Sequence, residues 1–270
     1  MFIFVTLITL NLNKKKMNDD LNYLPIIIPF QLVDVIQPTM SIVAHFRQLV
    51  LLYADQTTQI KLKAQFGNYG LSGTWSNGVT AMYWKHVLQM FTECVHWTEP
   101  NEPEWKHIHD YFYELADKRK VHTTSIFETM GDPILDVQHC TQNNVDELTI
   151  ATPNSYNIRV MLSNETTVTS TELPEIVVPS KVCIRMRRSF VYKFWRFDLT
   201  KRWVGASRIL AERAQQHDVT EYEIELECIS PLEYLRITPN NYIATSLLLK
   251  ISDLLPPSLE KMDVFIRHRN

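Results

Sequence analysis

The stretch VTEYEIELEC, residues 219–228, carries a glutamate at every second position, with mainly apolar or aromatic residues between the glutamates. Successive side chains of a β-strand point to opposite faces, so this spacing predicts a strand with one acidic and one apolar face. The acidic positions are Glu221, Glu223, Glu225 and Glu227. Because carboxylates packed this closely are costly without cations beside them, the strand predicts positive charge near its acidic face.

Other segments alternate in the same way and carry basic residues on one face. They are IKLKAQFG (60–67), YNIRVMLS (156–163), KVCIRMRR (181–188) and WRFDLTKRW (195–203). The polar faces hold Lys61, Lys63, Arg159, Arg185, Arg187, Arg196, Asp198 and Thr200. For any single strand, an ordinary half-exposed antiparallel sheet would give this pattern. Taken together, the strands favour a closed barrel that directs acidic and basic faces into a common interior.

The rest of the chain predicts helices around a long antiparallel β-section. The expected helices are residues 38–53, 79–91, 102–117 and 240–255. Thr39 or Ser41 is the predicted N-cap of the first helix. The fold class is therefore α+β, an antiparallel β-barrel flanked by α-helices. Residues 1–20 are expected to form a disordered leader, and residues 21–270 a single domain.

Composition argues against several functional classes. A net charge of −3 and a pI near 6.3 lack the basic signature of a protein that binds duplex nucleic acid. Four cysteines without a C-x-x-C pair argue against a zinc site and favour a reducing compartment. The sequence has no G-x-S-x-G, P-loop or H-E-x-x-H motif. The apolar run before Met17, where translation could begin, is too short to span a bilayer, so no membrane partner is expected.

An enclosed face of carboxylates, lysines and arginines suits a polyanion and a divalent metal ion. Carboxylate oxygens are preferred ligands of Mg²⁺ and Mn²⁺, and arginine forms bidentate hydrogen bonds to phosphate. In triphosphate hydrolysis the metal polarises the γ-phosphate, arginine and lysine stabilise charge on the phosphoryl oxygens, and an acid or base orients water. The pattern therefore indicates triphosphate chemistry.

The chain resembles the metal-dependent RNA 5′-triphosphatases of the triphosphate tunnel metalloenzymes, found in the mRNA capping enzymes of fungi, protozoa and large cytoplasmic DNA viruses. The resemblance rests on YNIRVMLSNE (156–165), KVCIRMRRSFVYKFWRFDLTKRW (181–203) and YEIELE (222–227), in this order. It implies a tunnel-shaped barrel, a Mg²⁺ or Mn²⁺ cofactor and hydrolysis of the γ-phosphate at the 5′ end of nascent RNA, the first step of mRNA capping. It also implies a separate guanylyltransferase or a transcription or capping complex as partner. The expected location is cytoplasmic, in the virus factory or the virion if the protein is viral.

The resemblance also assigns roles to the residues expected to face the tunnel. The implied metal ligands are Glu223, Glu225 and Glu227. The expected substrate-binding residues are Arg159, Arg185, Arg187, Lys61 and Lys63, with Arg188 as the alternative register to Arg187. The implied catalytic residues are Arg196, Asp198 and Thr200.

One motif departs from the family pattern E-x-E-x-R-hydrophobic-G, because residues 61–67 read K-x-K-x-Q-F-G. Lys61 and Lys63 together carry the formal charge of one Mg²⁺ and could pair with Glu223 and Glu225. An ammonium group, however, cannot act as a Lewis acid. Three interpretations follow: an RNA 5′-triphosphatase, a catalytically inactive tunnel-fold subunit that binds or regulates a capping or transcription assembly, and a structural β-domain whose charged faces are solvated.

Overall fold

The structure is a computed structural model of the chain. It describes residues 32–53, 58–69, 74–98, 104–115, 120–127, 136–152, 156–168, 178–229, 231–255 and 266–268. The expected disordered leader, residues 1–20, lies outside the described residues.

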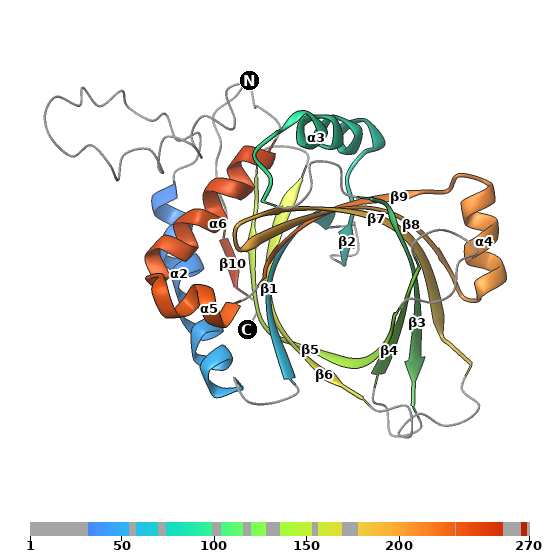
Figure 1. Ribbon diagram of the computed structural model, residues 1–270, viewed down its shortest axis with the longest axis horizontal. Helices are drawn as coiled ribbons and strands as arrows, with labels where there is room; N and C mark the ends of the chain where they lie inside the picture. Colours follow the sequence, from blue (N-terminus) through green and yellow to red (C-terminus); the bar gives the residue numbers. More distant parts are fainter. Residues whose placement is uncertain are drawn as a thin grey trace, which may run out of the picture.

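Eight strands form a closed antiparallel barrel, seen end-on in Figure 1. They are β1 (Thr58–Tyr69), β3 (Lys106–Glu114), β4 (Lys120–Phe127), β5 (Asp136–Ile150), β6 (Asn157–Thr167), β7 (Lys181–Tyr192), β8 (Trp195–Gly205) and β9 (Glu221–Cys228). Around the ring the order is β1-β6-β5-β4-β3-β7-β8-β9, and β9 pairs with β1 to close it. Two short strands add to it: β2 (Trp75–Asn77) pairs with β1, and β10 (Ile266–His268) pairs with β5. The predicted fold class, an antiparallel barrel flanked by helices, is confirmed.

The helices lie on the outside of the barrel (Figure 1). They are α2 (Leu32–Leu52), α3 (Ala81–Glu93), α4 (Arg208–Gln216), α5 (Pro231–Ile237) and α6 (Asn240–Leu254). The α2 and α6 helices pack against each other, and α2 also contacts β1 and β5. By length and composition α2 could cross a membrane, but its side chains Val43 and Phe46 are fully buried in the protein core. The α4 helix covers β7 and β8 on another side of the barrel.

The hydrophobic core lies between the barrel and its helices, because strand alternation sends the apolar faces outward. Leu62 of β1, Ile224 of β9 and Leu247 of α6 are at most 1% exposed and belong to the larger cluster. A smaller cluster under α4 contains Ile184 and Trp203. The polar faces of the same strands are therefore left to line the bore.

The structure corrects two predictions about local structure. The helix predicted at 102–117 is wrong, because residues 106–114 form β3 and pair with β4 and β7. Two neighbouring strands satisfy its backbone hydrogen bonds, and these long-range pairings override the helical pattern of the segment. The first helix begins at Leu32 rather than near residue 38. The hydroxyl of Thr39 consequently lies inside the helix and donates to the carbonyl of Val35 at 2.7 Å, instead of capping the helix.

Candidate active site

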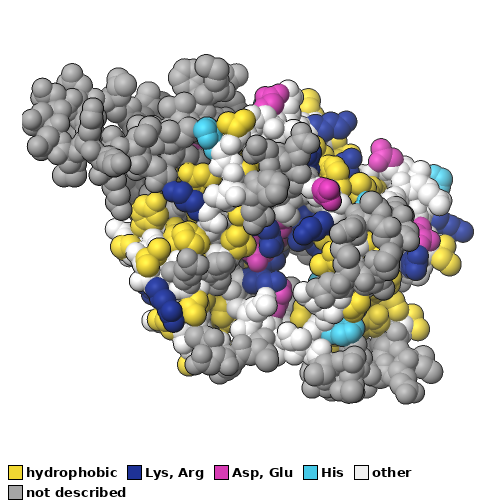
Figure 2. All heavy atoms as spheres, in the orientation of Figure 1, with side chains coloured by type: hydrophobic (Ala, Val, Ile, Leu, Met, Phe, Trp, Pro, Cys, Tyr) yellow, Lys and Arg dark blue, Asp and Glu magenta, His cyan; other side chains and the backbone are white. Residues whose placement is uncertain are grey.

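Charged side chains from β1, β6, β7, β8 and β9 line the bore of the barrel. Figure 2 shows lysine, arginine, aspartate and glutamate side chains gathered around an opening at the centre of the molecule. Strand register decides which of them meet. In the β1–β9 pair, Lys63 stands opposite Glu227, and Gln65 stands opposite Glu225.

Lys63 occupies the centre of this charged group. Its Nζ lies 3.2 Å from Oε1 of Glu225 and 3.5 Å from Oε2 of Glu227. Burial by itself lowers the pKa of a lysine, but the two carboxylates outweigh it and hold the pKa of Lys63 above its usual value. The ammonium group is therefore charged at neutral pH and acts as a fixed counter-ion to both glutamates.

Glu225 is held ionised by three neighbours. Burial would raise its pKa, but Lys63, Arg187 and a hydrogen bond from Gln65 lower it to about 2. The amide Nε2 of Gln65 donates to Oε2 of Glu225 at 2.7 Å. The carboxylate thus keeps its charge throughout the physiological pH range.

Asp198 of β8 lies beside the two glutamates and is 2% exposed. The hydroxyl of Ser189 donates to its Oδ1 at 2.6 Å, and Nε of Arg196 lies 3.1 Å from both of its oxygens. Arg187 approaches Oδ2 at 3.3 Å. Arg196 also links this group to Glu227, because its Nη2 donates to Oε2 of that residue at 2.8 Å.

Asp198, Glu225 and Glu227 could by spacing alone hold a metal ion, since an oxygen from each lies within 4.8 Å of the others. Lys63, Arg187 and Arg196, however, supply one cation for each carboxylate. A divalent ion needs oxygen ligands that retain their negative charge and free lone pairs. With Lys63 in place, the residues present do not fit a divalent metal.

The three predicted metal ligands are not grouped together. Glu225 and Glu227 meet Asp198, whereas Glu223 pairs with Arg202, whose Nη1 lies 2.6 Å from its Oε1. Asp198 was expected as a catalytic residue, and the structure places it in the acidic group instead of Glu223. Neither Arg202 nor its pairing was identified from sequence, although Arg202 shares the inward parity of Arg196 and Asp198 on the same strand.

The other predicted residues line the bore at different positions. Arg185 contacts Asp110 of β3, and Lys61 contacts Glu165 of β6. The side chain of Thr200 is 3% exposed, and its strand register places it opposite Arg187 and Glu223.

The structure distinguishes the two arginine registers on β7. Arg187 points inward to Asp198, whereas the guanidinium of Arg188 lies 5.9 Å from the centre of the Trp105 ring and 5.6 Å from that of Phe190. Arg187 therefore belongs to the charged group, and Arg188 belongs to the aromatic surroundings of the barrel.

Asp110 is a site residue that the sequence analysis missed. It is 2% exposed, contacts Arg185, and accepts a hydrogen bond from Thr124 at 2.9 Å. Its carboxylate oxygen also lies 2.8 Å from Nε2 of His122. Burial opposes ionisation, but Arg185 and His122 hold the pKa of Asp110 well below its usual value. The segment was predicted to be a helix, and even on a strand Asp110 shares its face with the apolar Ile108 and Phe112, so no local pattern marked it as a site residue.

Comparison with known proteins gives a family match and a fold match. The family described as "mRNA capping enzyme, beta chain" matches residues 47–241. The S. pombe Pct1 RNA triphosphatase has a similar structure, with 16% sequence identity and a TM-score of 0.59 over 80% of this chain and 91% of that one. Pct1 in complex with the Spt5 CTD matches with 16% identity and a TM-score of 0.58, over 80% of this chain and 93% of that one. No curated protein matches the sequence.

Proposed function

The chain belongs to the mRNA capping enzyme beta chain family, and from that premise we propose that it binds the 5′-triphosphate end of RNA in its tunnel without a divalent metal ion. The fold is that of the Pct1 RNA triphosphatase, and the barrel of this chain encloses a charged bore. A triphosphate is a compact polyanion, and it is bound most strongly by clustered arginine and lysine side chains in an enclosed site.

The position of Lys63 between Glu225 and Glu227 carries the proposal. The ammonium supplies positive charge in the acidic group, where a divalent ion would otherwise be required to offset the carboxylates. It does so permanently, because the same carboxylates raise its pKa. The same position argues against hydrolysis as the function, because an ammonium group cannot polarise a phosphoryl oxygen as a metal ion does.

The arginines keep donors for a phosphate even while they pair with carboxylates. A guanidinium has five N–H donors, and one carboxylate uses two at most. Arg187 is an example, because its Nη1 lies 3.3 Å from Asp198 while its side chain remains 20% exposed. The carboxylates therefore hold the arginines in place, and the remaining donors can bind phosphoryl oxygens.

Metal-dependent hydrolysis of the γ-phosphate, the first step of mRNA capping, is the second candidate function. The convergence of Asp198, Glu225 and Glu227 within 4.8 Å favours it. For either function we expect a separate guanylyltransferase or a transcription assembly as partner. Pct1, which shares the fold, forms a complex with the Spt5 CTD.

Binding without metal tests the first function. Fluorescence anisotropy in EDTA should show that an RNA oligonucleotide with a 5′-triphosphate binds roughly 10-fold or more tightly than the same RNA with a 5′-monophosphate, about 1.4 kcal/mol. Lys61→Met should weaken the triphosphate complex, whereas Lys85→Met on the exposed face of α3 should not. Equal affinity for the two RNA ends would refute the proposal.

Release of γ-phosphate from triphosphate-ended RNA in Mn²⁺ or Mg²⁺ separates the two functions. We expect the wild type to release little and a Lys61→Glu, Lys63→Glu double variant to gain activity, because it regains two carboxylates and loses the fixed counter-ion. The second candidate is supported instead if the wild type is active and Glu225→Ala abolishes that activity. In an active protein, Glu223→Ala should change the Mn²⁺ concentration needed for activity less than Glu225→Ala does, because Glu223 pairs with Arg202.

A further inference from the structure

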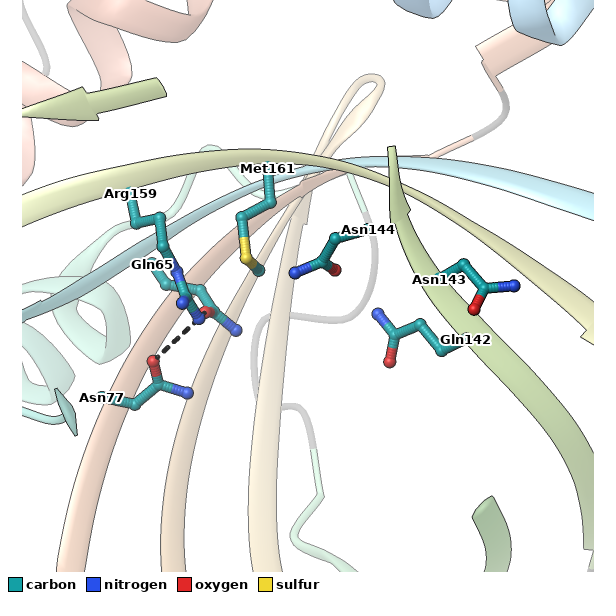
Figure 3. Close-up of a pocket in the computed structure, with 7 residues that line it drawn as sticks. All are labelled: Gln65, Asn77, Gln142, Asn143, Asn144, Arg159 and Met161. Carbon is teal, nitrogen blue, oxygen red and sulfur yellow. Dashed lines mark hydrogen bonds between the residues drawn. The ribbon is translucent and has the colours of Figure 1, made fainter. Parts of the chain in front are cut away.

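One stretch of the tunnel wall is neutral and rich in amides, unlike the charged wall formed by β7, β8 and β9. A cavity of about 400 Å³ lies against it (Figure 3). Its lining residues are Gln65, Asn77, Gln142, Asn143, Asn144, Arg159 and Met161. Five of the seven are amides, and only Arg159 carries a charge. A cavity of this size falls within the roughly 300–1,000 Å³ typical of small-molecule sites.

The amides on β5 have unused hydrogen-bonding capacity. Asn144 makes no side-chain hydrogen bond with any other described residue. Within the described part of the chain, the side chain of Gln142 makes one long hydrogen bond, from its Nε2 to Oγ of Ser163 at 3.3 Å. Both side chains are exposed to solvent, and Figure 3 shows them reaching from β5 toward the cavity, with Met161 beside them. The cavity therefore offers both donors and acceptors, together with one apolar contact.

Arg159 closes the opposite side of the cavity and is held in place by several neighbours, among them Glu147, whose Oε2 lies 4.0 Å from its Nη1. Its Nη2 donates to Oε1 of Gln65 at 2.9 Å and lies 3.4 Å from Oδ1 of Asn77. Its guanidinium also lies 4.9 Å from the centre of the Trp75 ring. One face of the guanidinium is covered by Trp75, and its other face is the one on which a planar ring can stack.

Gln65 connects the cavity to the charged group. Gln65 accepts from Arg159 and donates to Glu225 at 2.7 Å, and Glu225 in turn contacts Lys63 at 3.2 Å. A ligand whose anionic part meets Lys63 can therefore place a neutral part against the amides.

A nucleoside has the chemistry that this cavity fits. Its base has flat faces and an edge of donors and acceptors, its ribose has hydroxyl groups, and neither carries a charge. Asparagine and glutamine bind such edges well because each side chain both donates and accepts. Inorganic polyphosphate gains little from neutral amides and would be bound by the cations alone.

We propose that the amide-lined cavity binds the base and ribose of the first nucleotide, so that the tunnel selects a nucleotide 5′-triphosphate end over inorganic polyphosphate. This inference rests on the proposed function, since it requires the triphosphate to bind at the adjoining charged group. It assigns the recognition of the nucleoside to Gln142 and Asn144. It assigns to Arg159 a contact with both the nucleoside and the triphosphate.

Competition binding in EDTA tests the inference, with two ligands: triphosphate-ended RNA and inorganic tripolyphosphate. The wild type should prefer the RNA by roughly 10-fold, the contribution of one or two net hydrogen bonds. A Gln142→Ala, Asn144→Ala double variant should lose that preference and bind tripolyphosphate as the wild type does. Both substituted residues are exposed, so the thermal unfolding temperature should not change. Gln216→Ala, an exposed amide on α4 outside the barrel, is the matched control.

The outcomes separate this inference from the function on which it rests. If the wild type binds neither ligand, the proposed function fails, and the inference fails with it. If tripolyphosphate binds as tightly as RNA, or if the double variant keeps the wild-type preference, triphosphate binding stands and the nucleoside site is refuted. An equal loss of affinity for both ligands would also refute it, because the amides would then support the charged group rather than the nucleoside.

Discussion

Replacement of Lys63 by methionine removes the ammonium from between Glu225 and Glu227 and keeps a linear side chain of similar length. Both glutamates remain largely shielded from solvent, with side chains 15% (Glu225) and 8% (Glu227) exposed. Arg187 and Arg196 then face three carboxylates alone, and the group acquires a net negative charge. The variant should therefore be less stable than the wild type and should acquire affinity for a divalent cation.

The size of the effect follows from the burial of the pair. Removing one partner of a buried ion pair costs about 3–5 kcal/mol, because the other charge stays buried without compensation. At 2–4 °C per kcal/mol, the value for chains somewhat shorter than this one, the unfolding temperature should fall by roughly 6–20 °C. A divalent cation at 100 times its dissociation constant would restore about 2.7 kcal/mol.

Thermal unfolding by circular dichroism, with and without Mn²⁺, measures both effects. We expect Mn²⁺ to raise the unfolding temperature of Lys63→Met and to leave that of the wild type unchanged. Lys61→Met is the matched control, because its ammonium pairs with Glu165, which lies outside the group of three carboxylates. This control should show no response to Mn²⁺.

Two results would contradict this reasoning. If Lys63→Met unfolds within about 1 °C of the wild type, less than 1 kcal/mol is lost, and the ammonium is not the buried counter-ion of the glutamates. If the wild type gains as much stability from Mn²⁺ as the variant does, a metal ion binds with Lys63 in place, and the second candidate function gains the support that the first one loses.

Three further predictions concern stability. The folded-state pKa of Glu225 is about 2, below its ordinary value of 4.5, so the ionised carboxylate should stabilise the fold by about 3 kcal/mol above pH 4.5. This stabilisation should disappear as the pH falls toward 2. Urea unfolding across this range should show the loss, and a free energy of unfolding that does not change with pH would refute the prediction. Gly67→Ala should destabilise the protein by about 1–3 kcal/mol in urea unfolding, since a Cβ there would lie 2.3 Å from the carbonyl oxygen of Ser76 and 2.7 Å from the Trp75 ring. Asp110→Asn should lower the free energy of unfolding by about 3 kcal/mol or more in the same assay, because it leaves Arg185 without its buried partner. A variant as stable as the wild type would show that the ion pair is dispensable.

Much of the barrel was predictable because burial along a strand follows a period of two. The inward faces of β1, β7, β8 and β9 were read correctly, and Lys63, Arg187 and Glu225 all line the bore. This pattern is local, since it needs only the order of residues within one strand. The β3 strand was missed because its segment also fits helical spacing, and only pairing with β4 and β7 decides between the two structures.

The sequence by itself determined which side chains share a face, and it placed Lys61 and Lys63 together on one face of β1. The tertiary structure alone decided which charges meet. Glu223 and Glu225 lie on one face of one strand, yet Glu223 pairs with Arg202 while Glu225 pairs with Lys63. The reason is strand register, which joins residues as distant as Gln65 and Glu225, 160 positions apart, through the closure of the barrel. No local pattern records that closure, because it depends on the packing of the whole barrel.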